Sequence, residues 1–94
     1  MGRSFDVVVV GGGIAGLAAA HAVLERSGGE VDVTLLEGAA SLGGKLALTE
    51  VAGVAVDAGA ESLLARRPEA LALVHAAGLG ADVVHPSAAG AWVW

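Results

Sequence analysis

Cysteine is absent from the 94 residues, which excludes disulfides, thiolate nucleophiles and cysteine-ligated metals and fits a cytoplasmic protein. Positive charge is scarce, with five Lys and Arg against ten Asp and Glu, and no basic run exceeds Arg66–Arg67. Binding to nucleic acid through phosphate neutralisation is therefore not expected. His21, His75 and His85 lie far apart without metal-ligand spacing, so no metal site is predicted.

Charged residues are also few overall, at 16% against 55% hydrophobic residues, a balance typical of the interior of a larger protein. Val7–Leu24 contains no Asp, Glu, Lys or Arg, so a membrane segment or a signal peptide is conceivable. Gly11–Gly13 and Gly16 interrupt this run, which favours buried elements of a folded domain. The apolar run that ends at Trp94 suggests the N-terminal piece of a longer protein.

The hydrophobic pattern predicts a βαβ unit in the first third of the chain. Phe5–Val10 is rich in valine without alternation, as in a strand buried on both faces. Ile14–Ser27 has helical spacing and ends before two glycines, and Val31–Glu37 alternates as a second strand. Further along the chain we expect strands at 46–51 and 54–57 joined as a hairpin, an irregular segment at 58–67, a helix at 68–77, and the start of a strand at 83–84.

The turn between the first strand and the helix matches the pattern G-x-G-x-x-G. Gly11 would allow the tight turn, Gly13 would let the backbone approach a pyrophosphate, and Gly16 would let the helix pack closely on the strand. The helix N-terminus at Ile14 and Ala15 would then present free N–H groups to the phosphates. The alternative is an ordinary glycine-rich turn in an alanine-rich sequence.

An acidic residue stands where dinucleotide-binding units need one. Glu37 ends the second strand 21 residues after Gly16, close to the spacing at which such a carboxylate holds ribose hydroxyls. It is also the residue type expected when the ribose carries no 2′-phosphate. By itself Glu37 could equally be a solvated carboxylate at a strand end, but strand, glycine motif, helix and acid in this order predict dinucleotide binding.

Two later motifs favour FAD over a nicotinamide cofactor. Gly43, Gly44 and Lys45 permit a second close backbone approach and supply a point charge, which a simple nicotinamide-binding unit does not need. Their alternative is a turn before a strand. The segment Asp57–Ser62, with Gly59, Ala60 and Glu61, could pass beside a flat ring, or its carboxylates could cap the hairpin exit. Arg66–Arg67 could clamp a substrate carboxylate or be a solvated pair.

These motifs together resemble a known family. The segments at 9–20 (VVGGGIAGLAAA), 35–37 (LLE) and 42–46 (LGGKL) resemble the FAD-binding amine-oxidase and phytoene-desaturase superfamily. Within it, the segments at 56–62 (VDAGAES) and 64–69 (LARRPE) resemble the bacterial protoporphyrinogen and coproporphyrinogen oxidases, and the later GLG, HP and GAWVW segments fit the same group. Many relatives carry Arg where Ser41 and Lys45 stand, which weakens the expected phosphate contacts at those positions.

The resemblance implies the N-terminal part of a Rossmann-like α/β domain in an FAD-dependent oxidase of haem synthesis. Such an enzyme dehydrogenates a porphyrinogen, and O2 reoxidises the flavin to release hydrogen peroxide. The resemblance further implies a substrate domain that is absent from these 94 residues, and it allows for peripheral membrane contact of the full-length protein. By position, Gly11, Gly13 and Gly16 would hold the pyrophosphate, and Glu37 would hold the adenosine ribose. Gly43–Lys45 would line the FAD cleft, and Gly59–Glu61 would run beside the flavin.

Two other functions remain open from the sequence. The chain could be a non-catalytic module that binds FAD weakly or pairs with another chain. It could also belong to a different oxidase of the superfamily, acting on an amine or a carotenoid precursor, although the segments at 56–69 argue against this. The catalytic residues, the oligomeric state and the particular porphyrinogen are not predicted.

Overall fold

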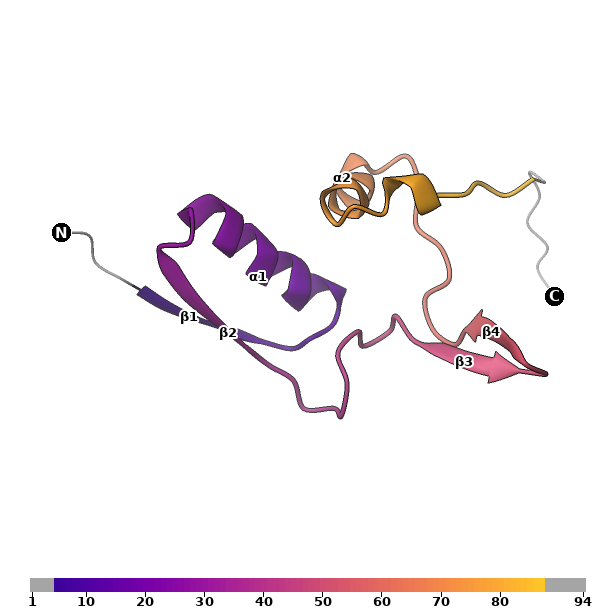
Figure 1. The fold of residues 1–94 in the computed structure, drawn as a ribbon, viewed down its shortest axis with the longest axis horizontal. Helices are drawn as coiled ribbons and strands as arrows, with labels where there is room; N and C mark the ends of the chain where they lie inside the picture. The colour runs from indigo at the N-terminus through magenta and orange to yellow at the C-terminus, as the bar shows by residue number, and fades with distance from the viewer. Residues whose placement is uncertain (1–4, 88–94) are drawn as a thin grey trace. The chain divides into compact units, whose positions relative to one another are not determined.

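The structure, a computed structural model, describes residues 5–87, and the chain divides after Ser62 into two compact units. Figure 1 shows the elements in chain order. They are β1 (Phe5–Val10), α1 (Ile14–Ser27), β2 (Val31–Leu36), β3 (Leu48–Val51), β4 (Val54–Asp57), α2 (Pro68–Ala76) and a short 3-10 helix, η1 (Gly80–Asp82). The α/β class and the βαβ order are as predicted.

The N-terminal unit is built around β1, α1 and β2. The two strands are parallel and in register from the pair Phe5–Val31 to the pair Val10–Leu36. Helix α1 is the crossover between them, and it contacts both strands (Figure 1). It ends at Gly28, whose φ of 61° is the left-handed conformation that glycine adopts without strain. The run of uncharged residues 7–24 is thus divided between a strand, a turn and a helix.

The two faces of this sheet differ in exposure. Val33 and Leu35 lie on one face and are half-buried, whereas Val8, Val10 and Leu36 on the other are 58%, 81% and 51% exposed. Among the described residues no apolar side chain is fully buried. Because a parallel sheet is normally covered on both faces, the exposed face of this two-stranded sheet is typical of part of a larger α/β domain.

β3 and β4 form the predicted hairpin, a second two-stranded sheet in which the strands are antiparallel. Their register runs from the pair Leu48–Asp57 to the pair Val51–Val54, so Ala52 and Gly53 form a two-residue turn. The φ angles of these two residues are 51° and 80°, as a type I′ turn requires. β3 begins two residues later than predicted, at Leu48.

In the C-terminal unit, α2 begins at Pro68 as predicted and ends one residue early, at Ala76. Gly78, with φ of 78°, turns the chain into η1. The predicted strand at Val83–Val84 is wrong: Val83 is extended, but within the described residues neither valine pairs with a strand. The segment at 90–94 lies outside the described residues. No helix between residues 5 and 87 is long and apolar enough to cross a membrane.

Candidate dinucleotide-binding site

The chain leaves β1 through a glycine turn that leads directly into α1. Gly11 has a φ of 105°. Its N–H donates to the carbonyl of Leu36, so the residue that follows β1 is hydrogen-bonded to the last residue of β2. Helix α1 begins at Ile14, with no acidic residue in its first turn. Its first N–H groups, those of Ile14 to Gly16, have no acceptor within the helix. This helix end therefore offers hydrogen-bond donors and a positive dipole end to an anion.

The glycines of this turn serve different steric needs. A Cβ at Gly16 would collide with the backbone carbonyl of Gly11, so the helix can approach the turn only because Gly16 has no side chain. A Cβ at Gly13, by contrast, would find nothing within 4 Å, and the φ of Gly13, −78°, suits any residue. The protein itself therefore does not require glycine at position 13, which leaves space there for a ligand.

Glu37 lies at the glycine turn, where a ribose-binding carboxylate is expected. Its Oε2 accepts a hydrogen bond of 2.8 Å from the N–H of Gly12, and its Oε1 accepts one of 2.9 Å from the N–H of Ala39. These backbone donors, Ala39 first and then Gly12, hold the pKa of Glu37 below its ordinary value of 4.5. The carboxylate is therefore ionised at neutral pH and fixed in orientation.

The second glycine motif packs directly against the first. The N–H of Gly43 donates to the carbonyl of Gly12 over 2.8 Å, and Gly43 forms an isolated parallel bridge with Gly13. Gly43 and Gly44 have φ angles of 114° and 55°, so both need glycine for their conformation. A Cβ at Gly44 would lie 3.2 Å from the Cα of Gly13. The two motifs, 30 residues apart, form one continuous backbone surface.

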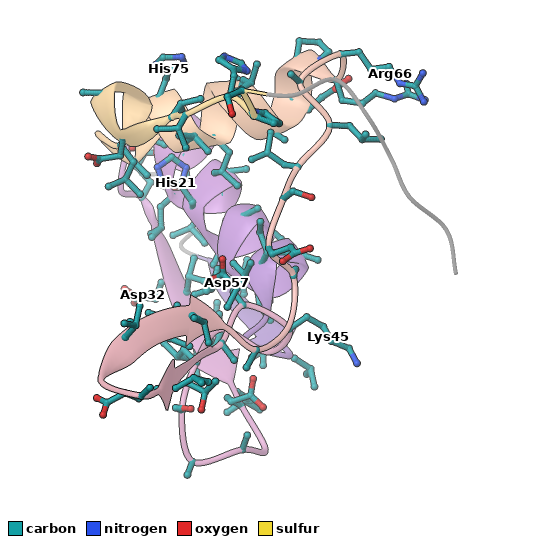
Figure 2. All side chains as sticks on the ribbon, turned by 90° about the vertical axis from the view of Figure 1, so that its right-hand side faces the viewer. His21, Asp32, Lys45, Asp57, Arg66 and His75 are labelled. Atoms are coloured by element: carbon teal, nitrogen blue, oxygen red, sulfur yellow. The ribbon has the colours of Figure 1, made fainter. Side chains whose placement is uncertain are left out.

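The third motif is joined to the second by backbone hydrogen bonds. The N–H of Ala60 donates to the carbonyl of Lys45, and the N–H of Ala58 donates to that of Ala47, each over 2.8 Å. These bonds continue the register of the β3–β4 hairpin beyond the strands themselves. Gly59 lies so close to the carbonyl of Lys45 that a Cβ there would collide with it. The Lys45 side chain is exposed and extends away from the loop (Figure 2).

Sequence reasoning missed Gly12, which occupies the variable position of G-x-G-x-x-G. It is the one buried residue in the described part of the chain, and both its N–H and its carbonyl are engaged within the protein. Its φ is not positive, but a Cβ would lie 2.5 Å from Leu42 Cδ2 and 2.8 Å from Glu37 Oε2. The uninterrupted run of three glycines was the available signal.

The remaining predicted candidates make no hydrogen bond to the glycine motifs among the contacts of the described residues. Arg66 and Arg67 belong to the C-terminal unit, where Arg67 is the N-cap of α2 and the Arg66 side chain is exposed (Figure 2). Glu61 follows the pairing of Ala60 with Lys45 and is exposed. Between residues 5 and 87, His, Asp and Glu side chains nowhere gather in a group of three that could hold a metal ion.

Fold and site together define the class of this protein. A parallel βαβ unit, a glycine turn at a helix N-terminus and an acidic residue at the end of the second strand are the features of a Rossmann-like dinucleotide-binding domain. The family described as the NAD(P)-binding Rossmann-like domain matches residues 9–77, and the chain belongs to this family.

Comparison with individual proteins confirms the resemblance to porphyrinogen oxidases. The chain is 46% identical over 71 residues to the coproporphyrinogen III oxidase of Mycobacterium leprae, covering 76% of this chain and 16% of that protein. A crystal structure from Exiguobacterium sp. 255-15, provisionally described as a protoporphyrinogen oxidase, matches with a TM-score of 0.71 and 41% identity over 86% of this chain and 18% of that one. The hydroxyneurosporene desaturase of Rubrivivax gelatinosus is 49% identical over 57 residues, 61% of this chain and 10% of its own length. The chain thus spans about a sixth of the length of the porphyrinogen oxidases it matches.

Proposed function

We propose that this chain is the N-terminal FAD-binding segment of a porphyrinogen oxidase. The observation that supports this most is the continuity of the three motifs. Gly12 is bonded to Glu37 and to Gly43, and Lys45 is bonded to Ala60, so the phosphate turn, the acidic residue and both later motifs form one connected site. A nicotinamide-binding βαβ unit needs only the first two of these parts.

The described residues fit an FAD molecule in several respects. The N–H groups of Ile14, Ala15 and Gly16 would donate to the diphosphate, and the missing side chain of Gly13 would let it approach. Glu37 would accept hydrogen bonds from the adenosine ribose hydroxyls, and its negative charge would disfavour a 2′-phosphate.

The later motifs would bind the flavin half of the cofactor. Gly43 and Gly44 would line the cleft, Lys45 would supply a positive charge near the phosphates, and Gly59–Glu61 would run beside the isoalloxazine ring. The redox chemistry would come from bound FAD: the substrate would lose two electrons and two protons, and O2 would take up both to become hydrogen peroxide. The residues of this chain would bind and orient the cofactor, with substrate contacts supplied by other parts of the full-length protein.

The substrate class is proposed from the relatives. Proteins named coproporphyrinogen III oxidase match over 76% of the chain, whereas the desaturase matches over 61%. We therefore propose dehydrogenation of coproporphyrinogen III or protoporphyrinogen IX, in the cytoplasm or at a membrane surface, with O2 as the electron acceptor.

The experiment is to purify the full-length protein and measure its flavin content and its O2 consumption with coproporphyrinogen. A yellow protein that releases FAD on denaturation and consumes O2 with this substrate is expected. A colourless, flavin-free protein would overturn the proposal. Parallel assays with an amine and with a carotenoid precursor distinguish a porphyrinogen oxidase from the other oxidases of the superfamily. Activity with one of these two compounds alone would show that the substrate is not a porphyrinogen.

A further inference from the structure

The carboxylate of Glu37 is hydrogen-bonded to the protein backbone through both of its oxygens. Oε2 accepts from Gly12, in the turn after β1, and Oε1 accepts from Ala39, in the turn after β2. One side chain thus connects the segments that leave the carboxyl ends of the two parallel strands. A ribose-binding residue with no other role would not need either bond.

The hydrogen bond from Gly12 to Glu37 also affects the segments next to Gly12. The carbonyl of the same glycine accepts from the N–H of Gly43, so both polar groups of a buried residue are fixed from opposite sides. Gly12 immediately precedes Gly13 and the open N–H groups at the start of α1. A shift of Gly12 would therefore move both the donors at the helix end and the second glycine motif.

These two bonds leave the carboxylate able to bind a ligand as well. An ionised carboxylate offers about four acceptor positions, and the backbone uses two of them. Hydrogen bonds to a charged acceptor are also stronger than those between neutral groups, so they can hold a backbone segment that lacks regular secondary structure.

We propose that Glu37 is a positioning residue for the phosphate-binding turn: its carboxylate holds the Gly12 peptide in place and so presets the N–H donors at the start of α1 for the diphosphate. This inference rests on the proposed dinucleotide function and adds a second role to the same carboxylate. It predicts that Glu37 matters even for a ligand that has no ribose hydroxyls to offer.

The test compares two ligands on the flavin-free full-length protein, ADP and 2′,3′-dideoxy-ADP, by calorimetric titration. Glu37→Gln keeps the size of the side chain and one acceptor oxygen but replaces the other oxygen with a donor that faces a backbone N–H. We expect this substitution to lower the binding affinity for both ligands by about tenfold. Loss of a negative charge alone would strengthen the binding of an anion, so weaker binding cannot come from the charge.

Full retention of dideoxy-ADP affinity in Glu37→Gln, with loss for ADP only, would overturn the positioning role and leave a ribose contact alone. The matched control is Glu30→Gln, an exposed glutamate just before the other end of β2, which should leave both affinities unchanged.

A second measurement needs no ligand. Amide hydrogen exchange in the flavin-free protein should show faster exchange of the Gly12 N–H in Glu37→Gln than in the wild type, while the Glu30→Gln control should match the wild type. Unchanged exchange at Gly12 would overturn the positioning role. If the wild type binds neither FAD nor ADP, the proposed function fails, and the exchange measurement still decides whether Glu37 holds the turn.

Discussion

The βαβ unit and the β3–β4 hairpin are both two-stranded, but different contacts hold them. In the βαβ unit the strands are parallel and 20 or more residues apart in sequence, and α1 covers one face. In the hairpin the strands are antiparallel, joined by two residues, and every residue is exposed. The first depends on packing between distant segments, and the second depends on its turn and its register.

This difference extends to the candidate site. The turn at Gly11–Gly16 is set by the approach of α1 to β1, whereas Gly59–Glu61 is placed by continuation of the hairpin register through Lys45. A substitution at Gly16, where α1 meets the turn, should therefore disturb tertiary packing, and one in the hairpin turn should have a small, local effect. Four predictions test this comparison.

The largest effect is expected for Gly16→Ala. The new Cβ would collide with the carbonyl of Gly11, so the start of α1 and the turn after β1 would have to move apart. We expect a loss of about 3 kcal/mol in the free energy of unfolding, measured by urea titration. Gly38→Ala is the control, because a Cβ there meets nothing within 4 Å and should leave stability unchanged. Wild-type stability of Gly16→Ala would contradict the close packing described above.

Gly13→Ala should separate binding from folding. Its Cβ has open space and a permitted φ, so the stability of the flavin-free protein should change by no more than about 0.5 kcal/mol. The methyl group would, however, occupy the space in which the diphosphate is proposed to lie, and FAD should bind about tenfold or more weakly. Fluorescence titration with FAD measures the affinity, and a urea titration measures the stability. An undiminished affinity for FAD would show that the diphosphate does not lie next to Gly13.

A smaller, stabilising effect is expected in the hairpin turn. Ala52 has a φ of 51°, a left-handed conformation that is unfavourable for alanine and well tolerated by asparagine. Ala52→Asn should therefore raise the free energy of unfolding by about 0.5–1 kcal/mol. Ala55→Asn, within β4, is the matched control and should give no gain. A loss of stability in Ala52→Asn would show that the turn is not of type I′.

The smallest expected effect concerns pH. Because Ala39 and Gly12 hold the pKa of Glu37 below 4.5, the ionised side chain stabilises the folded state at pH values above 4.5. This contribution is lost as the pH falls through the lowered pKa of the folded protein. The stability difference between wild type and Glu37→Gln should thus be constant near neutral pH and narrow in acid, as urea titrations across that range would show. A difference independent of pH would contradict the backbone bonds to the carboxylate.

Much of the fold could be predicted because its signals are local. The bounds of α1 follow from the glycine turn before Ile14 and from Gly28 after Ser27, and β4 follows from the hairpin signal at Ala52-Gly53. The strand expected at Val83–Val84 was wrong because two β-branched residues favour an extended backbone without supplying a partner strand. A strand exists only where another segment accepts its hydrogen bonds.

The sequence by itself determined the order of strand, glycine turn, helix and acidic residue, since each depends on the conformational range and polarity of neighbouring residues. Only the tertiary structure decided that Glu37 and Gly43 both hydrogen-bond to Gly12, and that Lys45 pairs with Ala60. The physical reason is that the positions where a side chain is forbidden depend on which backbone lies opposite. The spacing of residues along the chain does not show which backbone segment will lie opposite a given position, because this is set only when the strands pair and the helix packs on them.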